Sequence, residues 1–156
     1  SFAHHGAARL PRIERPGAIL TVIAGTAYGK QSPVDVFSPT LYVDAQLTDG
    51  AAIEVPDEHQ QRACYVAQGR IEIAGQAYGE GQFMLFASAA GPVSMRALET
   101  ARVMLAGGAP LDGPRHIDWN FVSSTRERIE VARRDWRERR FAPLPGYAER
   151  IPLPDE

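Results

Sequence analysis

The sequence predicts an all-β protein, an antiparallel β-barrel of the jelly-roll sandwich type with one C-terminal helix. Short apolar runs that alternate with polar residues, such as Arg70-Ile71-Glu72-Ile73, are typical of half-buried strands. Turns such as Gln68-Gly69 and Ala74-Gly75 separate these runs, because glycine accepts positive φ without steric cost. Near the C-terminus, by contrast, the apolar spacing is that of an amphipathic helix.

Apolar segments predict about nine strands between residues 18 and 106, enough to close a small barrel filled by side chains. The clearest is Leu41–Leu47, in which every second residue is apolar and lies on one face. The nine segments are Ala18–Ala24, Val34–Phe37, Leu41–Leu47, Ile53–Val55, Cys64–Val66, Arg70–Ile73, Phe83–Phe86, Val93–Leu98 and Arg102–Ala106.

A helix is predicted after the last strand. Ser124 and Glu127 have the spacing of a capping box, in which hydroxyl and carboxylate satisfy free N–H groups of the first turn. The helix should run from about Thr125 to Glu138, with one apolar stripe. The seven arginines between residues 126 and 140 form either a solvated face or a docking face for an acidic partner.

The ends of the chain are expected to be extended. Pro11, Pro16 and Gly17 disfavour a helix near the N-terminus, and prolines punctuate the last residues as well. The predicted organisation is therefore an extended arm over residues 1–17, a β-barrel over 18–122, and a helix with an extended tail over 123–156.

The composition of the chain argues against general binding to nucleic acid or to membranes. A chain of 156 residues suits one domain, and a net charge of −2 gives no general attraction to nucleic acid or to an anionic membrane. No apolar run approaches the roughly 20 residues that span a bilayer, and the first 15 residues lack the apolar core of a signal peptide. The single cysteine, Cys64, cannot form an internal disulfide, so a cytoplasmic location is expected.

The glycine spacing resembles the first conserved motif of the cupins. Gly50 and Gly69 fit the ends of that motif, and Gly81 fits the start of the second. In cupins these motifs supply three histidines and a glutamate that bind a metal. The resemblance places those four ligand positions, called here the ligand frame, on Pro56, Glu58, Arg62 and Pro92. Only Glu58 could coordinate, and one carboxylate makes a weak metal site.

Two longer phrases resemble the C-terminal half of pirin-related proteins. They are IAGTAYGKQSPVDVFSPTLYVDAQLTDGA and GGAPLDGPRHIDWNFVSSTRERIEVARRDWRERRF, and the resemblance extends along the whole chain. Pirins are two-cupin proteins whose N-terminal half carries a three-His, one-Glu iron site, which their C-terminal half usually lacks. The resemblance therefore implies no cofactor in this chain, with iron expected only where a complete first half is present.

The candidate ligand-binding residues are Glu58, His59 and His116. His59 is either a ligand or a surface or turn residue, and His116 either orients a ligand or braces its loop by a hydrogen bond. No Ser-His-Asp order, phosphate loop or Cys-x-x-Cys is present, so no catalytic residue and no metal ligand is assigned.

Three functions remain open from the sequence. In the first, a metal-free cupin serves as a structural and protein-interaction module, whose partner is a metal-bearing cupin half, a regulatory protein or a second copy of itself. In the second, the chain is an enzyme of the quercetin 2,3-dioxygenase type reported for pirins, which needs a metal site. In the third, the mouth of the barrel binds a small ligand without chemistry.

Overall fold

A computed structural model gives the fold and describes residues 3–88, 91–142, 146, 149 and 151–154. The chain forms two compact units, residues 1–110 and residues 111–156. No helix in these described ranges is both long enough and apolar enough to cross a membrane.

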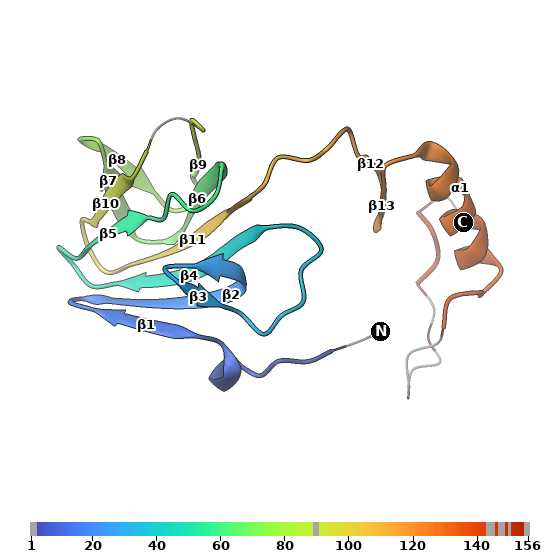
Figure 1. The fold of residues 1–156 in the computed structure, drawn as a ribbon, viewed down its shortest axis with the longest axis horizontal. Helices are drawn as coiled ribbons and strands as arrows, with labels where there is room; N and C mark the ends of the chain where they lie inside the picture. The colour runs from blue at the N-terminus through green and yellow to red at the C-terminus, as the bar shows by residue number, and fades with distance from the viewer. Residues whose placement is uncertain (1–2, 89–90, 143–145, 147–148, 150, 155–156) are drawn as a thin grey trace. The chain divides into compact units, whose positions relative to one another are not determined.

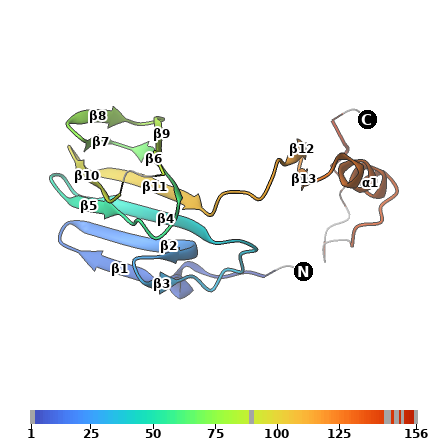
Figure 2. The same cartoon turned by 45° about the horizontal axis from the view of Figure 1, so that its top comes forward.

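The first unit consists of two antiparallel sheets (Figures 1 and 2). The larger follows the strand order β1-β2-β4-β11-β6-β9, with β3 paired to β2, and the smaller follows β5-β10-β7-β8. The strands are β1 (Arg12–Arg15), β2 (Ala18–Ala27), β3 (Lys30–Gln31), β4 (Thr40–Leu47), β5 (Ala52–Val55), β6 (Gln61–Gln68), β7 (Arg70–Ile73), β8 (Gln76–Gly79), β9 (Phe83–Phe86), β10 (Val93–Ala97) and β11 (Ala101–Gly108).

The predicted fold class, all-β with a jelly-roll sandwich and one C-terminal helix, is confirmed, but the predicted closure of the barrel is wrong. No described strand of one sheet is hydrogen-bonded to a strand of the other. Both sheets instead contribute inward-facing residues to one buried apolar cluster. Burial between two layers, rather than a continuous ring of backbone hydrogen bonds, therefore holds this unit together.

Alternation along the strands decides which side chains enter this core. In β4 the apolar residues at alternate positions from Leu41 to Leu47 are at most 2% exposed. The neighbouring strands of the same sheet add Cys64, Val66, Val103 and Leu105, and the facing sheet adds Ile53, Val55, Ile71 and Met95.

Two predicted turns are confirmed. Gly69 joins β6 to β7 at φ +75°, and Ala74-Gly75 joins β7 to β8 with φ positive at both residues. This two-residue pattern is the type I′ turn that matches the twist of antiparallel strands. The position of Gly69 also demands the absence of a side chain, because an added Cβ would lie 2.4 Å from the carbonyl oxygen of Thr100.

The strand predicted over Val34–Phe37 is wrong, since the structure has no strand between β3 and β4. Prolines at 33 and 39 remove backbone donors on both sides of this segment. Phe37 is fully exposed there. In the N-terminal segment, β1 pairs with the edge of β2, with Arg12 opposite Thr21.

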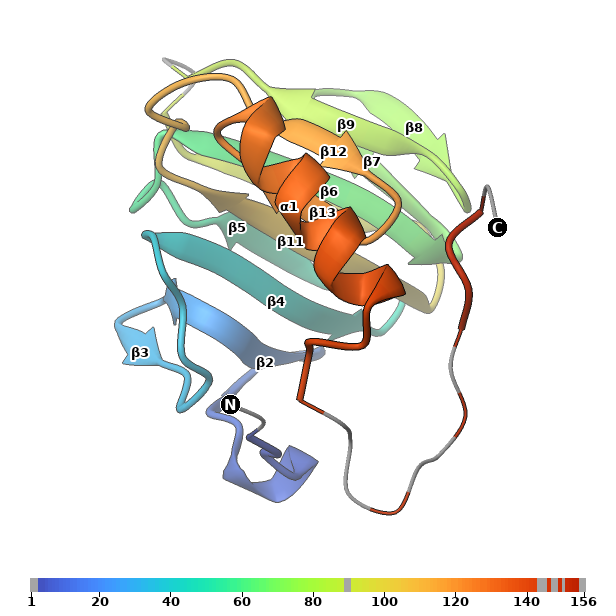
Figure 3. The same ribbon diagram turned by 90° about the vertical axis from the view of Figure 1, so that its right-hand side faces the viewer.

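The second unit contains β12 (His116–Asp118), β13 (Phe121–Ser123) and α1 (Arg126–Arg137). The helix packs against the β12–β13 hairpin (Figure 3). Aromatic rings join the hairpin to the helix, with the centroids of Trp119 and Trp136 5.2 Å apart. The predicted helix is confirmed, but its N-cap is Thr125 rather than Ser124, because the Thr125 hydroxyl accepts from Arg128 N–H.

The last residues follow this helix. The indole N–H of Trp136 donates to the carbonyl oxygen of Ile151 at 2.9 Å, which holds part of the tail. The described residues after α1 contain no further helix or strand, while residues 143–145, 147–148, 150, 155 and 156 of the predicted extended tail lie outside the described residues.

Candidate functional site

The hairpin between β2 and β3 forms one side of the candidate site. Its turn is Tyr28-Gly29, and both residues have positive φ, +53° and +69°. The Tyr28 hydroxyl donates to the carbonyl oxygen of Glu54 in β5 at 2.7 Å, which links the larger sheet to the smaller one. The guanidinium carbon of Arg15 lies 5.4 Å from the centre of the Tyr28 ring, a cation–π distance.

Glu58 and His59 both contact this hairpin, although the alternation of a strand would have pointed them apart. An Oε1 atom of Glu58 accepts from Gly29 N–H at 3.3 Å. Nε2 of His59 lies 3.0 Å from the carbonyl oxygen of Thr26. Because a carbonyl oxygen only accepts, Nε2 must carry the hydrogen and has no lone pair for a metal.

The burial of His59 corrects one sequence-based interpretation. One of the two interpretations was a surface or turn position; His59 does lie in a bend before β6, but it is only 8% exposed. The hydroxyl of Thr26 is a further neighbour of its ring, 3.3 Å from Nε2. His59 therefore fastens the loop between β5 and β6 to the hairpin.

Arg62 is the most deeply buried charged residue of the first unit. It faces inward from β6, on the same side as Cys64 and Val66, and is 2% exposed. One Nη1–H donates to the carbonyl oxygen of Pro56 at 3.4 Å. Its Nε–H is buried and has no hydrogen-bond partner.

A cavity of about 190 Å³ lies beside these residues. Three positions of the ligand frame, Pro56, Glu58 and Pro92, line it, and the fourth, Arg62, bonds to Pro56. The structure therefore brings the frame positions together as the glycine spacing predicts. The other lining residues are Arg15, Tyr28, Ile53, Glu54, Val55 and Asp57.

The residues at this place do not fit a metal ion. Across the described ranges, no group of three or more His, Cys, Asp or Glu side chains could hold one. Two frame positions are prolines, and the cation Arg62 stands at a third, where it would repel a metal.

Burial dominates the electrostatics of the neighbouring titratable groups. Desolvation raises the pKa of the Tyr28 hydroxyl well above its usual value, and the nearby Arg15 charge offsets only part of this. Desolvation also raises the pKa of the Cys64 thiol to about 12. Both groups are neutral at physiological pH, so neither supplies a nucleophile here.

His116, the third candidate, belongs to the second unit. It opens β12 and pairs with Ser123 of β13. Two residues on, a carboxylate oxygen of Asp118 accepts from Arg133 of α1 at 2.5 Å, so an ion pair joins this strand to the helix.

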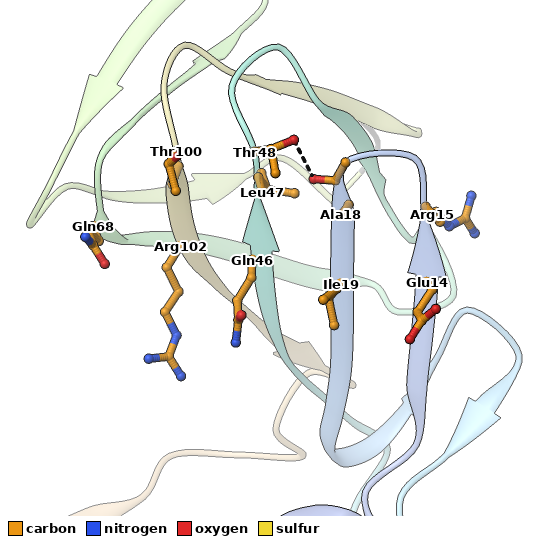
Figure 4. A pocket seen from close by; sticks show the side chains of 12 residues that line it. Glu14, Arg15, Ala18, Ile19, Gln46, Leu47, Thr48, Gln68, Thr100 and Arg102 are labelled. Atoms are coloured by element: carbon orange, nitrogen blue, oxygen red, sulfur yellow. Dashed lines mark hydrogen bonds between the residues drawn. The ribbon is translucent and has the colours of Figure 1, made fainter.

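A larger hollow of about 670 Å³ lies at the strand ends of the bigger sheet (Figure 4). Gln46, Gln68 and Arg102 are among the polar side chains around it. The Arg102 guanidinium already donates to both carboxylate oxygens of Asp44, at 2.8 and 2.9 Å. Arg102 is therefore already paired, while the other arginine of this hollow, Arg15, lies over the Tyr28 ring.

An exposed apolar patch is expected from the sequence on a half that docks a partner, but the sequence did not locate it; the structure has one on the outer side of the larger sheet. Phe83 and Leu85 of β9 are 62% and 76% exposed. Tyr65 lies opposite Phe83 on the neighbouring strand. Leu85 and Tyr42 lie at the two ends of one row of paired residues across the sheet, which runs through Ala63 and Ala106. The signal was the unbroken run Phe83-Met84-Leu85-Phe86, because a strand apolar on both faces is typical of one covered on both sides.

The two-sheet jelly roll and the glycine frame around its mouth are the features of a cupin fold. The chain belongs to the family of the pirin C-terminal cupin domain, whose model matches residues 42–142. The resemblance seen in the sequence is thereby confirmed.

Individual relatives agree with this family. A Pirin-like protein of Caulobacter vibrioides is 45% identical over 99% of this chain and 54% of its own length. A quercetin 2,3-dioxygenase structure from Acinetobacter baumannii has a TM-score of 0.81 at 26% identity, over 93% of this chain and 50% of that one. The chain thus spans about half the length of the curated relatives it matches.

Proposed function

We propose that this chain acts as a metal-free cupin half, a structural and protein-interaction module that docks a metal-bearing cupin half. The outer apolar face, defined by Tyr42, Tyr65, Phe83 and Leu85, carries this proposal. Contiguous exposed apolar patches of this kind mark interaction sites in soluble proteins. The face also includes the edge strand β9, whose backbone is open to pairing.

The ligand frame supports the same function. Pro56 and Pro92 cannot bind a metal, and a third frame position holds the cation Arg62, which donates to the Pro56 carbonyl. The relatives are about twice as long as their match to this chain, so their remaining length can hold a second cupin. A half that keeps the fold without metal donors suits a supporting role.

The test mixes this chain with the part of the Caulobacter Pirin-like protein that the match leaves uncovered. We expect a one-to-one complex in analytical ultracentrifugation. Replacing Leu85 with Glu should weaken it at least roughly tenfold, because the complex would bury a charge in an apolar contact. Phe37→Glu is the matched control, since Phe37 is equally apolar and fully exposed but lies outside the outer apolar face.

Two results would contradict this proposal. One is the absence of any complex between the two proteins at micromolar concentration. The other is an equal loss of binding in Leu85→Glu and Phe37→Glu, because binding would then not depend on the outer apolar face.

A second candidate is quercetin 2,3-dioxygenase activity, which the similarity to the Acinetobacter baumannii structure favours. It requires about one iron per chain, for which Glu58, His59 and His116 are the candidate donors, although no group of three or more such donors is found among the described residues. Metal content after anaerobic iron loading, followed by the loss of quercetin absorbance, tests it. Less than about 0.1 iron per chain would remove the site on which this activity depends.

A further inference from the structure

Arg62 lacks the partners that a buried arginine normally has. Its side chain is 2% exposed and lies in the interior between the sheets. On one side its neighbour in β11 is Gly107, which contributes no side chain, and on the other it is Phe86 of β9. Within the described residues its one hydrogen bond is the 3.4 Å contact to Pro56, near the upper limit for such a bond.

No carboxylate among the described residues is paired with this charge. Glu58, four residues earlier, accepts instead from Gly29 N–H and is exposed. Asp44, the buried acid of the larger sheet, is engaged by Arg102. A buried charge without a counter-ion is strongly unfavourable, so buried arginines are normally paired with an anion.

We propose that Arg62 anchors the carboxylate of a small organic acid that enters from the mouth cavity. The acid would accept from the unpartnered Nε–H and from an Nη–H, the two parallel bonds that a guanidinium offers a carboxylate. To do so it takes over the weak contact that Pro56 makes with Nη1. This inference does not depend on the docking proposed for the outer apolar face.

The cavity lined by Pro56, the hydrogen-bond partner of Arg62, limits the size and character of the acid. Its volume of about 190 Å³ equals that of about six water molecules, so the acid has a short carbon skeleton. Ile53, Val55, Pro56 and Pro92 offer apolar contacts to such a skeleton, although polar atoms make up more of the cavity's lining.

The acidic residues around the cavity do not prevent this binding. Glu54, Asp57 and Glu58 are exposed, so solvent and salt screen their charges. The guanidinium is buried, where the dielectric is lower and its attraction for an anion is stronger. Glu58 is the nearest competitor along the chain, and we therefore expect Glu58→Gln to bind the acid more tightly.

Nitrogen-15 NMR of the Arg62 Nε–H group tests the proposal directly, with acetate as the probe and Arg62→Lys assigning the signal. Acetate at constant ionic strength should shift this signal saturably, whereas acetamide, which has the same shape but no charge, should not. Acetate at about ten times its Kd should also raise Tm by about 4 °C, by mass action.

Matched variants show whether acetate binds to the buried Arg62 or to an arginine on the surface. Arg62→Met should lose the acetate response, while Arg102→Met, on the outer side of the sheet, should keep it. Should Arg62→Met fail to fold, Arg62→Lys serves, since it keeps the charge but lacks the Nε–H. An Nε–H signal that acetate leaves unmoved, or that acetamide moves equally, would overturn the proposal.

Discussion

Single residues show most clearly which positions are restricted by their neighbours. Gly50 and Gly69 occupy the two ends of the same cupin motif, and both have φ near +75°. Nothing lies within 4 Å of the place where a Cβ on Gly50 would stand. A Cβ on Gly69 would meet the Thr100 carbonyl oxygen at 2.4 Å. One glycine is therefore needed for backbone conformation only, and the other also for space.

This difference predicts unequal effects of alanine. Gly50→Ala should lower the free energy of unfolding by about 1 kcal/mol, the strain of a left-handed residue. Gly69→Ala should lower it by about 3 kcal/mol, because the strand ends must also move apart. Urea unfolding measures both, and equal losses would show that the close approach of Gly69 to Thr100 is not a constraint.

The buried thiol of Cys64 predicts a pH dependence of stability. Its pKa is about 12 in the folded protein and 9.0 when unperturbed. Between these values the unfolded chain loses the proton and the native state keeps it. The free energy of unfolding should therefore fall as pH rises through this window, by at most about 1.4 kcal/mol per pH unit.

Urea unfolding at about pH 8 and about pH 10 checks this slope. Cys64→Ala should flatten it, although the smaller side chain lowers stability by a similar amount at both pH values. Tyr28 acts in the same direction but only above its own ordinary pKa of 10.0. An unchanged slope in Cys64→Ala would mean that other groups cause the loss.

At the scale of elements, α1 shows how narrowly a cap is defined. Thr125 has extended backbone angles, φ −132° and ψ +149°, and its hydroxyl accepts from the N–H three residues later. Ser124, the residue predicted from the capping-box spacing, lies one position too early. Sequence spacing locates the start of a helix to within a residue, but backbone conformation selects the cap.

Removing the two hydroxyls separately tests this assignment. Thr125→Ala should destabilise the first turn of α1 by about 1 kcal/mol, because one N–H of the helix loses its partner. Ser124→Ala should change its stability by less than about 0.5 kcal/mol. Amide hydrogen exchange at Arg128 measures both, and a larger effect of Ser124→Ala would restore the original capping box.

For the whole molecule, the outer apolar face predicts self-association when no other partner is present. Phe83 and Leu85 expose large apolar areas, and pairing two copies through this face would bury them. We therefore expect a homodimer in light scattering at micromolar concentration. Leu85→Glu should give monomers and Phe37→Glu should not, whereas a monomeric wild-type chain would count against the prediction.

The sequence by itself determined the layered β fold, the turns and the family. Strict alternation in segments such as Leu41–Leu47 leaves only one way to bury the apolar side chains, and the glycine spacing is local to the turns it forms. Glu58 and His59 are predictable from the sequence for the same reason, because both lie between Gly50 and Gly69, the glycines at the ends of the first motif.

Only the tertiary structure decided which buried charge has no counter-ion and which apolar side chains stay exposed. Among the described residues Arg62 has no counter-ion because of where Glu58, Asp44 and Gly107 lie, and no sequence spacing specifies this. Phe83 and Leu85 are likewise exposed because no described segment covers the outer side of β9. Contacts between distant segments set both properties, so they become visible only when the chain is folded.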